Sequence, residues 1–66
     1  MKEYRMLATE VIVLDSKGET IEEEAMPEGA IVKFQTKDDY TVGEFIRLEA
    51  GSGTVYIGKV IEAKKI

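Results

Sequence analysis

Few side chains in this chain of 66 residues have the chemistry of a catalytic site. Cys and His are both absent, so there is no thiol nucleophile, no imidazole base and no Cys/His zinc site. The serines are Ser16 and Ser52, and a serine nucleophile needs a neighbouring base to take its proton. Both lie in segments that we expect to be turns. We therefore predict that neither acts as a nucleophile.

The 13 acidic residues offer carboxylates for acid–base catalysis or for calcium binding. In an acidic protein of this size, carboxylates come near one another without a functional reason. The densest run, residues 22–24, lacks the spaced Asp or Asn ligands and the glycine of a calcium loop. We interpret this run as a solvated edge or loop, where charge also blocks pairing with foreign strands. The sequence predicts no metal site, no cofactor and no enzymatic activity.

Gly51, Ser52 and Gly53 form a glycine-rich segment that could suggest a phosphate-binding loop. A P-loop has two glycines separated by four residues, then Lys and Ser or Thr, and it opens a helix. Here the glycines separate two runs rich in β-branched and aromatic residues, 40–49 and 54–64, which is typical of a β-hairpin. A hairpin turn therefore accounts for the glycines.

The N-terminal half also has the patterns of strands and turns. Residues 4–14 alternate with a period of two, and Glu10 interrupts one face. We therefore expect Leu7, Val11 and Val13 in the core, with Ile12 and Leu14 outside or under a loop. A hairpin turn at residues 15–18 is indicated by an Asp that can bond to the backbone two residues on and by a Gly suited to the left-handed conformation. A short strand is expected at residues 19–23.

A second turn is predicted at residues 26–29, where Pro27 presets a dihedral angle and Gly29 allows the exit. The strand that follows, residues 30–36, alternates clearly and makes Phe34 the best candidate for a core aromatic. Residues 37–39 form a polar turn into the final hairpin, and residues 62–66 extend its last strand. Gly43 and Gly58 lie within the predicted strands, where glycine marks a bulge, a sharp bend or a close backbone approach. A bulge at Gly58 would place Val60 on the face of Val55 and Ile57.

These elements predict an all-β fold: a small five-stranded antiparallel barrel, SH3-like or OB-like, with short turns and no helix of length. The whole chain, residues 1–66, is expected to form a single domain. A domain of this size buries only about 60% of the surface of its unfolded chain. Its core is therefore thin, and self-association is one way to stabilise it.

The formal net charge of -4 disfavours nucleic acid as a partner, because binding to phosphates needs clustered Lys and Arg. The apolar runs are too short for a membrane span, and the N-terminus lacks the pattern of a secretory signal. We expect a cytoplasmic protein with a protein partner, which includes the option of a second copy of itself. The last two strands carry apolar residues on both faces, so the partner-binding residues are predicted to be Tyr40, Phe45 and Tyr56.

Several segments are similar to parts of one known domain. Residues 7–14 (Leu-Ala-Thr-Glu-Val-Ile-Val-Leu) place an acidic residue before a Val-x-Val-Leu run, and residues 26–29 read Met-Pro-Glu-Gly. Residues 43–49 and 54–60 form a hairpin with a Phe-containing strand followed by Thr-Val and a glycine. In this order they resemble the third, C-terminal β-barrel domain of elongation factor Tu type translational GTPases, without that domain's middle strands. The resemblance implies a trimmed β-barrel that contacts protein and RNA partners and has no catalytic role.

Three functions follow as hypotheses. The leading one is a non-enzymatic interaction module that binds a protein through the outer face of the C-terminal hairpin. The alternative is a translation-factor-like barrel associated with RNA or the ribosome, which requires its cations to converge on one face. These cations are Lys33, Lys37, Arg47, Lys59, Lys64 and Lys65. A phage structural protein or an acidic inhibitor is compatible with the size and charge, although no motif favours it.

Overall fold

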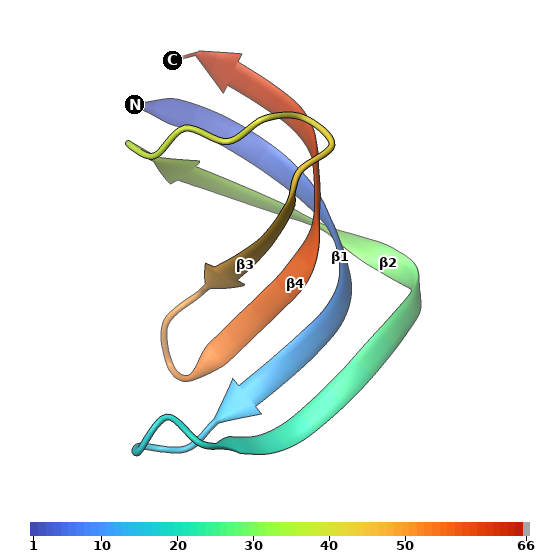
Figure 1. Ribbon diagram of the computed structural model, residues 1–66, viewed down its shortest axis with the longest axis vertical. Coiled ribbons are helices and arrows are strands. Elements are labelled where there is room, and N and C mark those ends of the chain that lie inside the picture. Colours follow the sequence, from blue (N-terminus) through green and yellow to red (C-terminus); the bar gives the residue numbers. More distant parts are fainter. Residues whose placement is uncertain (66) are drawn as a thin grey trace.

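Residues 1–65, the part of the chain that the computed structural model describes, form one antiparallel sheet of four strands (Figure 1). The strands are β1 (Lys2–Leu14), β2 (Thr20–Thr36), β3 (Phe45–Glu49) and β4 (Thr54–Lys65). Their order is β2-β1-β4-β3, so β1 and β4 lie side by side in the middle and β2 and β3 form the edges. The prediction of a small all-β fold without a helix is confirmed.

The predicted five-stranded barrel is wrong, because the described residues form four strands in a sheet that is not closed. The two strands expected at residues 19–23 and 30–36 belong to the single long strand β2, which pairs with β1 on both sides of a bulge. That bulge replaces the turn predicted at residues 26–29. Ala30 lies opposite Ala8 and Ala25 lies opposite Glu10, so four residues of β2 face Thr9 alone.

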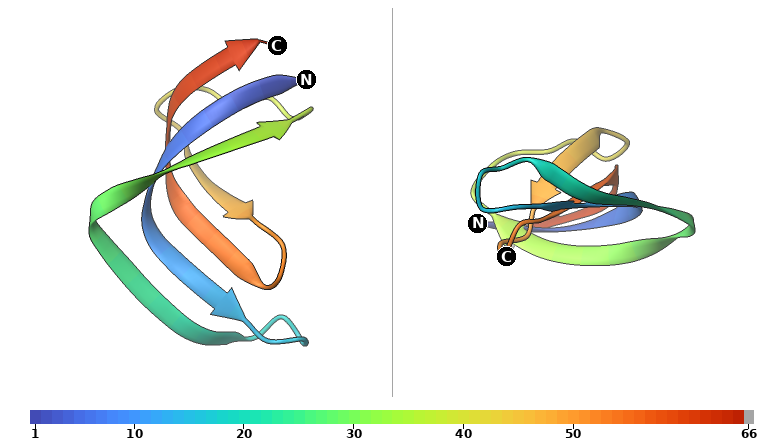
Figure 2. Two further views of the ribbon diagram at one scale, coloured as in Figure 1. Left: turned by 180° about the vertical axis from the view of Figure 1, so that it is seen from behind. Right: turned by 90° about the horizontal axis from the view of Figure 1, so that it is seen from below.

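The three long strands bend together near their middle (Figure 2). In β1 the register with β4 shifts at Thr9, and in β4 the register with β1 shifts at Ile61. An extra residue bends a strand and increases its twist, so these irregularities lie where the bend is needed. The first and last parts of the described chain lie side by side at one end of the bent sheet, where Lys2 is opposite Lys65 (Figure 1).

Gly58 lies beside this bend: it is opposite Ala8, and the next pair is Ile57 with Glu10, so the extra residue is Thr9 of β1 and not a residue of β4. Of the three roles that the sequence allows for Gly58, a bulge in β4 is therefore not the one found. A Cβ atom at Gly58 would overlap the carbonyl oxygen of Leu7 and would lie 2.7 Å from the Cα of Ala8. Close approach of β1 therefore requires glycine at this position. Because β4 is regular here, Val60 shares a face with Tyr56 and not with Val55 and Ile57.

Residues that lie opposite one another in the ladders share a face of the sheet, which defines two faces. The Tyr4 face carries Tyr4, Met6, Ala8, Val11, Val13, Val32, Phe34, Ile46, Leu48, Tyr56 and Val60. The Phe45 face carries Glu3, Arg5, Leu7, Glu10, Ile12, Glu23, Ile31, Lys33, Phe45, Arg47, Glu49, Val55, Ile57, Lys59, Glu62 and Lys64.

The main core lies on the Tyr4 face. Its buried residues are Tyr4, Met6, Ala8, Ile46 and Val60, and the partly buried residues packed against them are Met26, Val32, Phe34, Tyr40, Leu48 and Tyr56. Phe34 is thus a core aromatic, as predicted, but it is half-buried, whereas only 1% of Tyr4 is exposed.

The predicted core set of the first strand, Leu7, Val11 and Val13, is wrong, because all three are half-buried and they do not share a face. The bulge at Thr9 explains the error, since it reverses the alternation: Leu7 points to the Phe45 face and Val11 to the Tyr4 face. Ile12, expected outside or under a loop, is buried, and it lies opposite Val55 on the Phe45 face.

Other local predictions are confirmed. The Asp15 carboxylate accepts hydrogen bonds from the backbone N–H of Lys17 at 2.8 Å and of Glu19 at 2.9 Å, and Gly18 has a φ of 82°. β4 extends through the predicted tail to Lys65, whereas Ile66 lies outside the described residues. The first arm of the last hairpin is shorter than predicted, because β3 begins only at Phe45.

Candidate functional site

The three predicted partner-binding residues do not lie together. Tyr56 is half-buried on the Tyr4 face, and Tyr40 packs against the core of that face from the segment between β2 and β3. Phe45 lies on the opposite face and is 72% exposed. Phe45 is thus the most accessible of the three.

Tyr40 belongs to a cluster of three aromatic rings. Its ring meets the ring of Tyr4 edge-on with centroids 5.4 Å apart, and it meets the ring of Phe34 edge-on at 6.0 Å. The rings of Tyr4 and Phe34 are stacked at 5.5 Å. Aromatic pairs at these separations stabilise a core. Tyr40 therefore anchors its own segment to the core.

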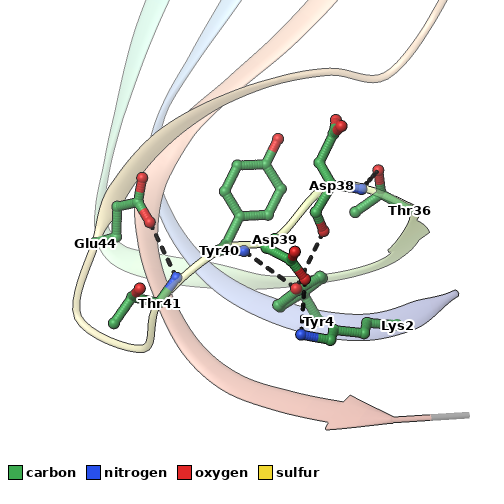
Figure 3. A network of polar contacts seen from close by, with 8 residues as sticks. All are labelled: Lys2, Tyr4, Thr36, Asp38, Asp39, Tyr40, Thr41 and Glu44. Carbon is green, nitrogen blue, oxygen red and sulfur yellow. Dashed lines mark hydrogen bonds and ion pairs between the residues drawn. The ribbon is translucent and has the colours of Figure 1, made fainter.

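Residues 37–44, which we call the β2–β3 loop, are held over the Tyr4 face by several polar contacts (Figure 3). The hydroxyl of Tyr4 accepts a hydrogen bond from the backbone N–H of Tyr40 and donates one to the carbonyl oxygen of Asp38, both at 3.1 Å. Backbone hydrogen bonds tie the loop to Val60 of β4: the N–H of Gly43 donates to the Val60 carbonyl at 2.8 Å, and the N–H of Val60 donates to the Glu44 carbonyl at 2.9 Å. One end of the Tyr4 face is therefore covered by the chain itself.

An ion pair also fixes this loop. The Lys2 ammonium lies 2.7 Å from a carboxylate oxygen of Asp39, and both side chains are well exposed. The hydrogen bond between them, and then their mutual attraction, raise the pKa of Lys2 and lower the pKa of Asp39. Solvent screens this exposed pair, so it positions the loop more than it stabilises the fold.

The Phe45 face, in contrast, has an accessible apolar row across all four strands. Ile31 of β2 lies opposite Leu7 of β1, Leu7 lies opposite Lys59 of β4, and Lys59 lies opposite Phe45 of β3. Ile31 is 58% exposed and Leu7 is half-buried, while the Lys59 ammonium is 6.0 Å from the centroid of the Phe45 ring. We call these four residues the Leu7 row.

Charged residues surround the Leu7 row unevenly. On the side toward the termini, the Phe45 face carries three cations and two carboxylates: Arg5, Lys33, Lys64, Glu3 and Glu62. Two ion pairs lie among them, Lys33 with Glu3 at 3.4 Å and Arg5 with Glu62 at 3.9 Å. On the other side it carries one cation and three carboxylates: Arg47, Glu10, Glu23 and Glu49. The face is therefore positive at one end and negative at the other.

The cations singled out from the sequence converge in part. Lys33, Arg47, Lys59 and Lys64 share the Phe45 face. Lys65 lies opposite Lys2 and outside that face, and Lys37 is in the β2–β3 loop. Carboxylates alternate with the four cations, so the face is mixed in charge and not a continuous basic surface.

Sequence reasoning missed Leu7 and Ile31 as surface residues. Leu7 was assigned to the core, and Ile31 was given no role in the strand predicted at residues 30–36. The signal that could have found them is the alternation itself: Ile31 and Lys33 have the same parity, so an apolar residue had to lie beside the cation on an exposed face.

A groove with mixed lining lies between the two sheet edges. Val32, Phe34 and Tyr40 border it on the β2 side and Leu48 on the β3 side, with Lys33, Asp38, Arg47 and Glu49 nearby. Within residues 1–65, no three His, Cys, Asp or Glu side chains are placed to hold a metal ion. In the same residues, no helix is long and apolar enough to cross a membrane.

Comparison with known proteins gives no relative: no protein-family model, no curated protein and no solved structure matches this chain significantly. The function has to be inferred from the surface of the molecule.

Proposed function

We propose that this chain is a non-enzymatic interaction module that binds a protein partner through the Phe45 face. The observation that carries the proposal is the Leu7 row, in which exposed Ile31 and Phe45 flank half-buried Leu7 and the alkyl stem of Lys59. Large apolar side chains exposed on one face of a small domain are typical of partner surfaces.

The chemistry of this row supports a protein partner. Aromatic residues and Arg are enriched where partners bind most strongly, and Phe45 lies in the ladder next to Arg47 on the same face. Lys and Arg side chains cover apolar surface with their stems while their charges stay in water. The Phe45 face can thus remain soluble alone and still offer apolar contact to a partner.

Site-specific photocrosslinking tests this proposal. We would place a benzophenone side chain at Ile31, in the Leu7 row, and in a matched protein at Val42, which is 56% exposed in the β2–β3 loop. In extracts of the source cells, we expect position 31 to give a discrete crosslinked product. An excess of unlabelled wild-type protein should suppress this product by competition, and an excess of the unlabelled Phe45→Ser variant should not. Equal products from positions 31 and 42, or equal competition by Phe45→Ser, would contradict the proposal.

An RNA-associated, translation-factor-like role is the second candidate, and one observation favours it. Five cations share the Phe45 face with an exposed aromatic ring, and aromatic rings stack on unpaired bases. Binding of a fluorescent single-stranded RNA at low salt tests it, because counterion release makes binding strongest there. RNA binding that Lys59→Gln and Arg47→Gln weaken would favour this role, and its absence at low salt would exclude it.

A further inference from the structure

We propose that the partner of the Phe45 face is a second copy of this chain, and that two sheets pack through this face as a twofold-symmetric β-sandwich. The inference rests on the proposed function, because it uses the same surface. It adds the identity of the partner and the direction of packing.

The first argument is charge complementarity within one face. The end of the Phe45 face toward the termini has a net charge of +1 and the opposite end has a net charge of -2, from the residues listed above. Lys59 lies in the Leu7 row, between the two ends, and adds charge to neither of them. A surface with one positive end, one negative end and an apolar centre complements itself when one copy is inverted relative to the other.

This charge distribution also selects the symmetry axis. A twofold axis that runs along the Leu7 row, across the strands, inverts the strand direction of the second copy. Ile31, Leu7 and Phe45 then pack on their own mates, Arg5 of one copy comes over Glu10 of the other, and Lys64 comes near Glu49. The two Lys59 side chains meet on the axis, so their stems pack in the interface while their charges have to reach solvent. An axis parallel to the strands would place the positive ends on each other, so we infer the first arrangement.

The available area is sufficient for a weak dimer. Neighbouring strands lie about 4.8 Å apart and each residue extends a strand by about 3.3 Å, so the face, three strands wide from Glu3 to Leu7 and four strands wide from Leu7 to Ile12, covers roughly 450 Å². Two copies would together bury roughly 900 Å², which is in the range of weak and transient interfaces. Aligned sheets pack in this way at about 10 Å separation. We therefore expect association that depends on concentration, in the micromolar range or weaker.

A gain in stability is the physical reason for such pairing. A domain with so few residues has little core, and this chain has no disulfide to stabilise it. Covering exposed Ile31 and Phe45 adds buried apolar surface that the single sheet lacks.

Analytical ultracentrifugation of the whole chain, from micromolar to millimolar concentration, tests the proposal. We expect the mass to rise with concentration from 7.4 kDa toward twice that value. We expect Phe45→Ser to weaken self-association at least about tenfold, because it removes the most exposed apolar contact. Val42→Ser, outside the face, serves as the control and should leave association unchanged.

A charge swap tests the direction of packing. Lys64→Glu and Glu49→Lys are each expected to weaken the dimer by roughly tenfold, since each puts like charges together in two symmetric places. The double variant restores the pairing and should recover most of the association. Both side chains are exposed, and thermal unfolding at low concentration will verify that each variant folds.

The outcomes separate this inference from the proposed function. A wild-type chain that stays at 7.4 kDa throughout overturns the dimer. If it does so while position 31 still crosslinks to a different protein, the interaction module stands and only its partner is wrong. Association that survives Phe45→Ser, or a double charge variant no better than the single ones, contradicts the proposed arrangement.

Discussion

The hydroxyl of Tyr4 in β1 lies 3.1 Å from the backbone nitrogen of Tyr40, which is 36 residues away in the chain (Figure 3). The same hydroxyl donates to the carbonyl oxygen of Asp38. A single buried side chain therefore satisfies two backbone groups of the β2–β3 loop. The loop thereby covers one end of the Tyr4 face.

We predict that Tyr4→Phe destabilises the protein by about 1–3 kcal/mol, because it leaves the N–H of Tyr40 and the carbonyl of Asp38 without their partner while the ring packing is kept. Urea unfolding measures the loss, and hydrogen exchange at the Tyr40 amide should become faster. Tyr56→Phe is the control, since it removes the hydroxyl of a half-buried tyrosine that does not hold the loop. Equal losses in both variants would show that the Tyr4 hydrogen bonds contribute nothing.

We predict that Gly58→Ala costs at least about 3 kcal/mol, the upper end of overpacking effects, because the backbone of Leu7 and Ala8 leaves no space for a methyl group. In Gly51→Ala the new methyl group meets no atom within 4 Å, so only the φ of 78° strains the backbone. We expect this strain to cost about 1–2 kcal/mol of stability. Circular dichroism during urea unfolding compares the two. A Gly58 variant as stable as the Gly51 variant would contradict the close approach of β1 and β4.

We predict that Met6→Ala destabilises the fold by about 2–5 kcal/mol, because Met6 is fully buried in the Tyr4 core. Phe45→Ala should change the stability of the monomer by no more than about 0.5 kcal/mol, since its ring is mostly exposed. Both values are measured at a low protein concentration, where association does not contribute. A large loss for Phe45→Ala would mean that Phe45 is a structural residue and not a contact residue.

We predict that the carboxyl of Asp39 titrates below its ordinary value of 3.8, because Lys2 stabilises its charged form. Since the pKa of Asp39 is lower in the folded state, its contribution to stability is present above pH 3.8 and is lost as the pH falls through the folded pKa. The raised pKa of Lys2 gives the opposite limit, because its contribution is present below pH 10.5 and is lost as the pH rises through its folded value. The pair therefore acts between these two limits.

Carbon-detected NMR of the side-chain carboxyl groups follows this titration. Lys2→Gln should move the Asp39 midpoint up toward its ordinary value, and added salt should do so partly. Lys37→Gln is the control, because it removes a neighbouring cation that is not the partner of Asp39 in the structure. A midpoint that does not respond to Lys2→Gln would contradict the ion pair.

The sequence was sufficient for local structure. The turn at Asp15 follows from the chemistry of one carboxylate and one glycine, and the final hairpin follows from two β-rich runs around a glycine-rich break. These features depend on residues a few positions apart, which a sequence displays directly. Strand type and the absence of helices were predictable for the same reason.

The sequence did not reveal the bulges, and these decide which side chains face each other. An extra residue at Thr9 reverses the alternation along β1, so Leu7 moved out of the predicted core and Ile12 moved inward. The Met-Pro-Glu-Gly segment was read as a turn because its residues suit a turn as well as they suit the bulge that they form. Only the pairing of β2 with β1 on both sides of this segment shows that β2 continues through it.

The central claim is that the Phe45 face binds a protein partner and that this partner is a second copy of the chain. Methyl NMR over a dilution series tests this claim most directly. We predict that the methyl signals of Leu7 and Ile31 shift as the concentration rises, and that those of Ile46 and Val60 on the Tyr4 face do not. Shifts confined to Ile46 and Val60 would contradict the claim, and so would signals of Leu7 and Ile31 that never change in a sample shown by sedimentation to dimerise.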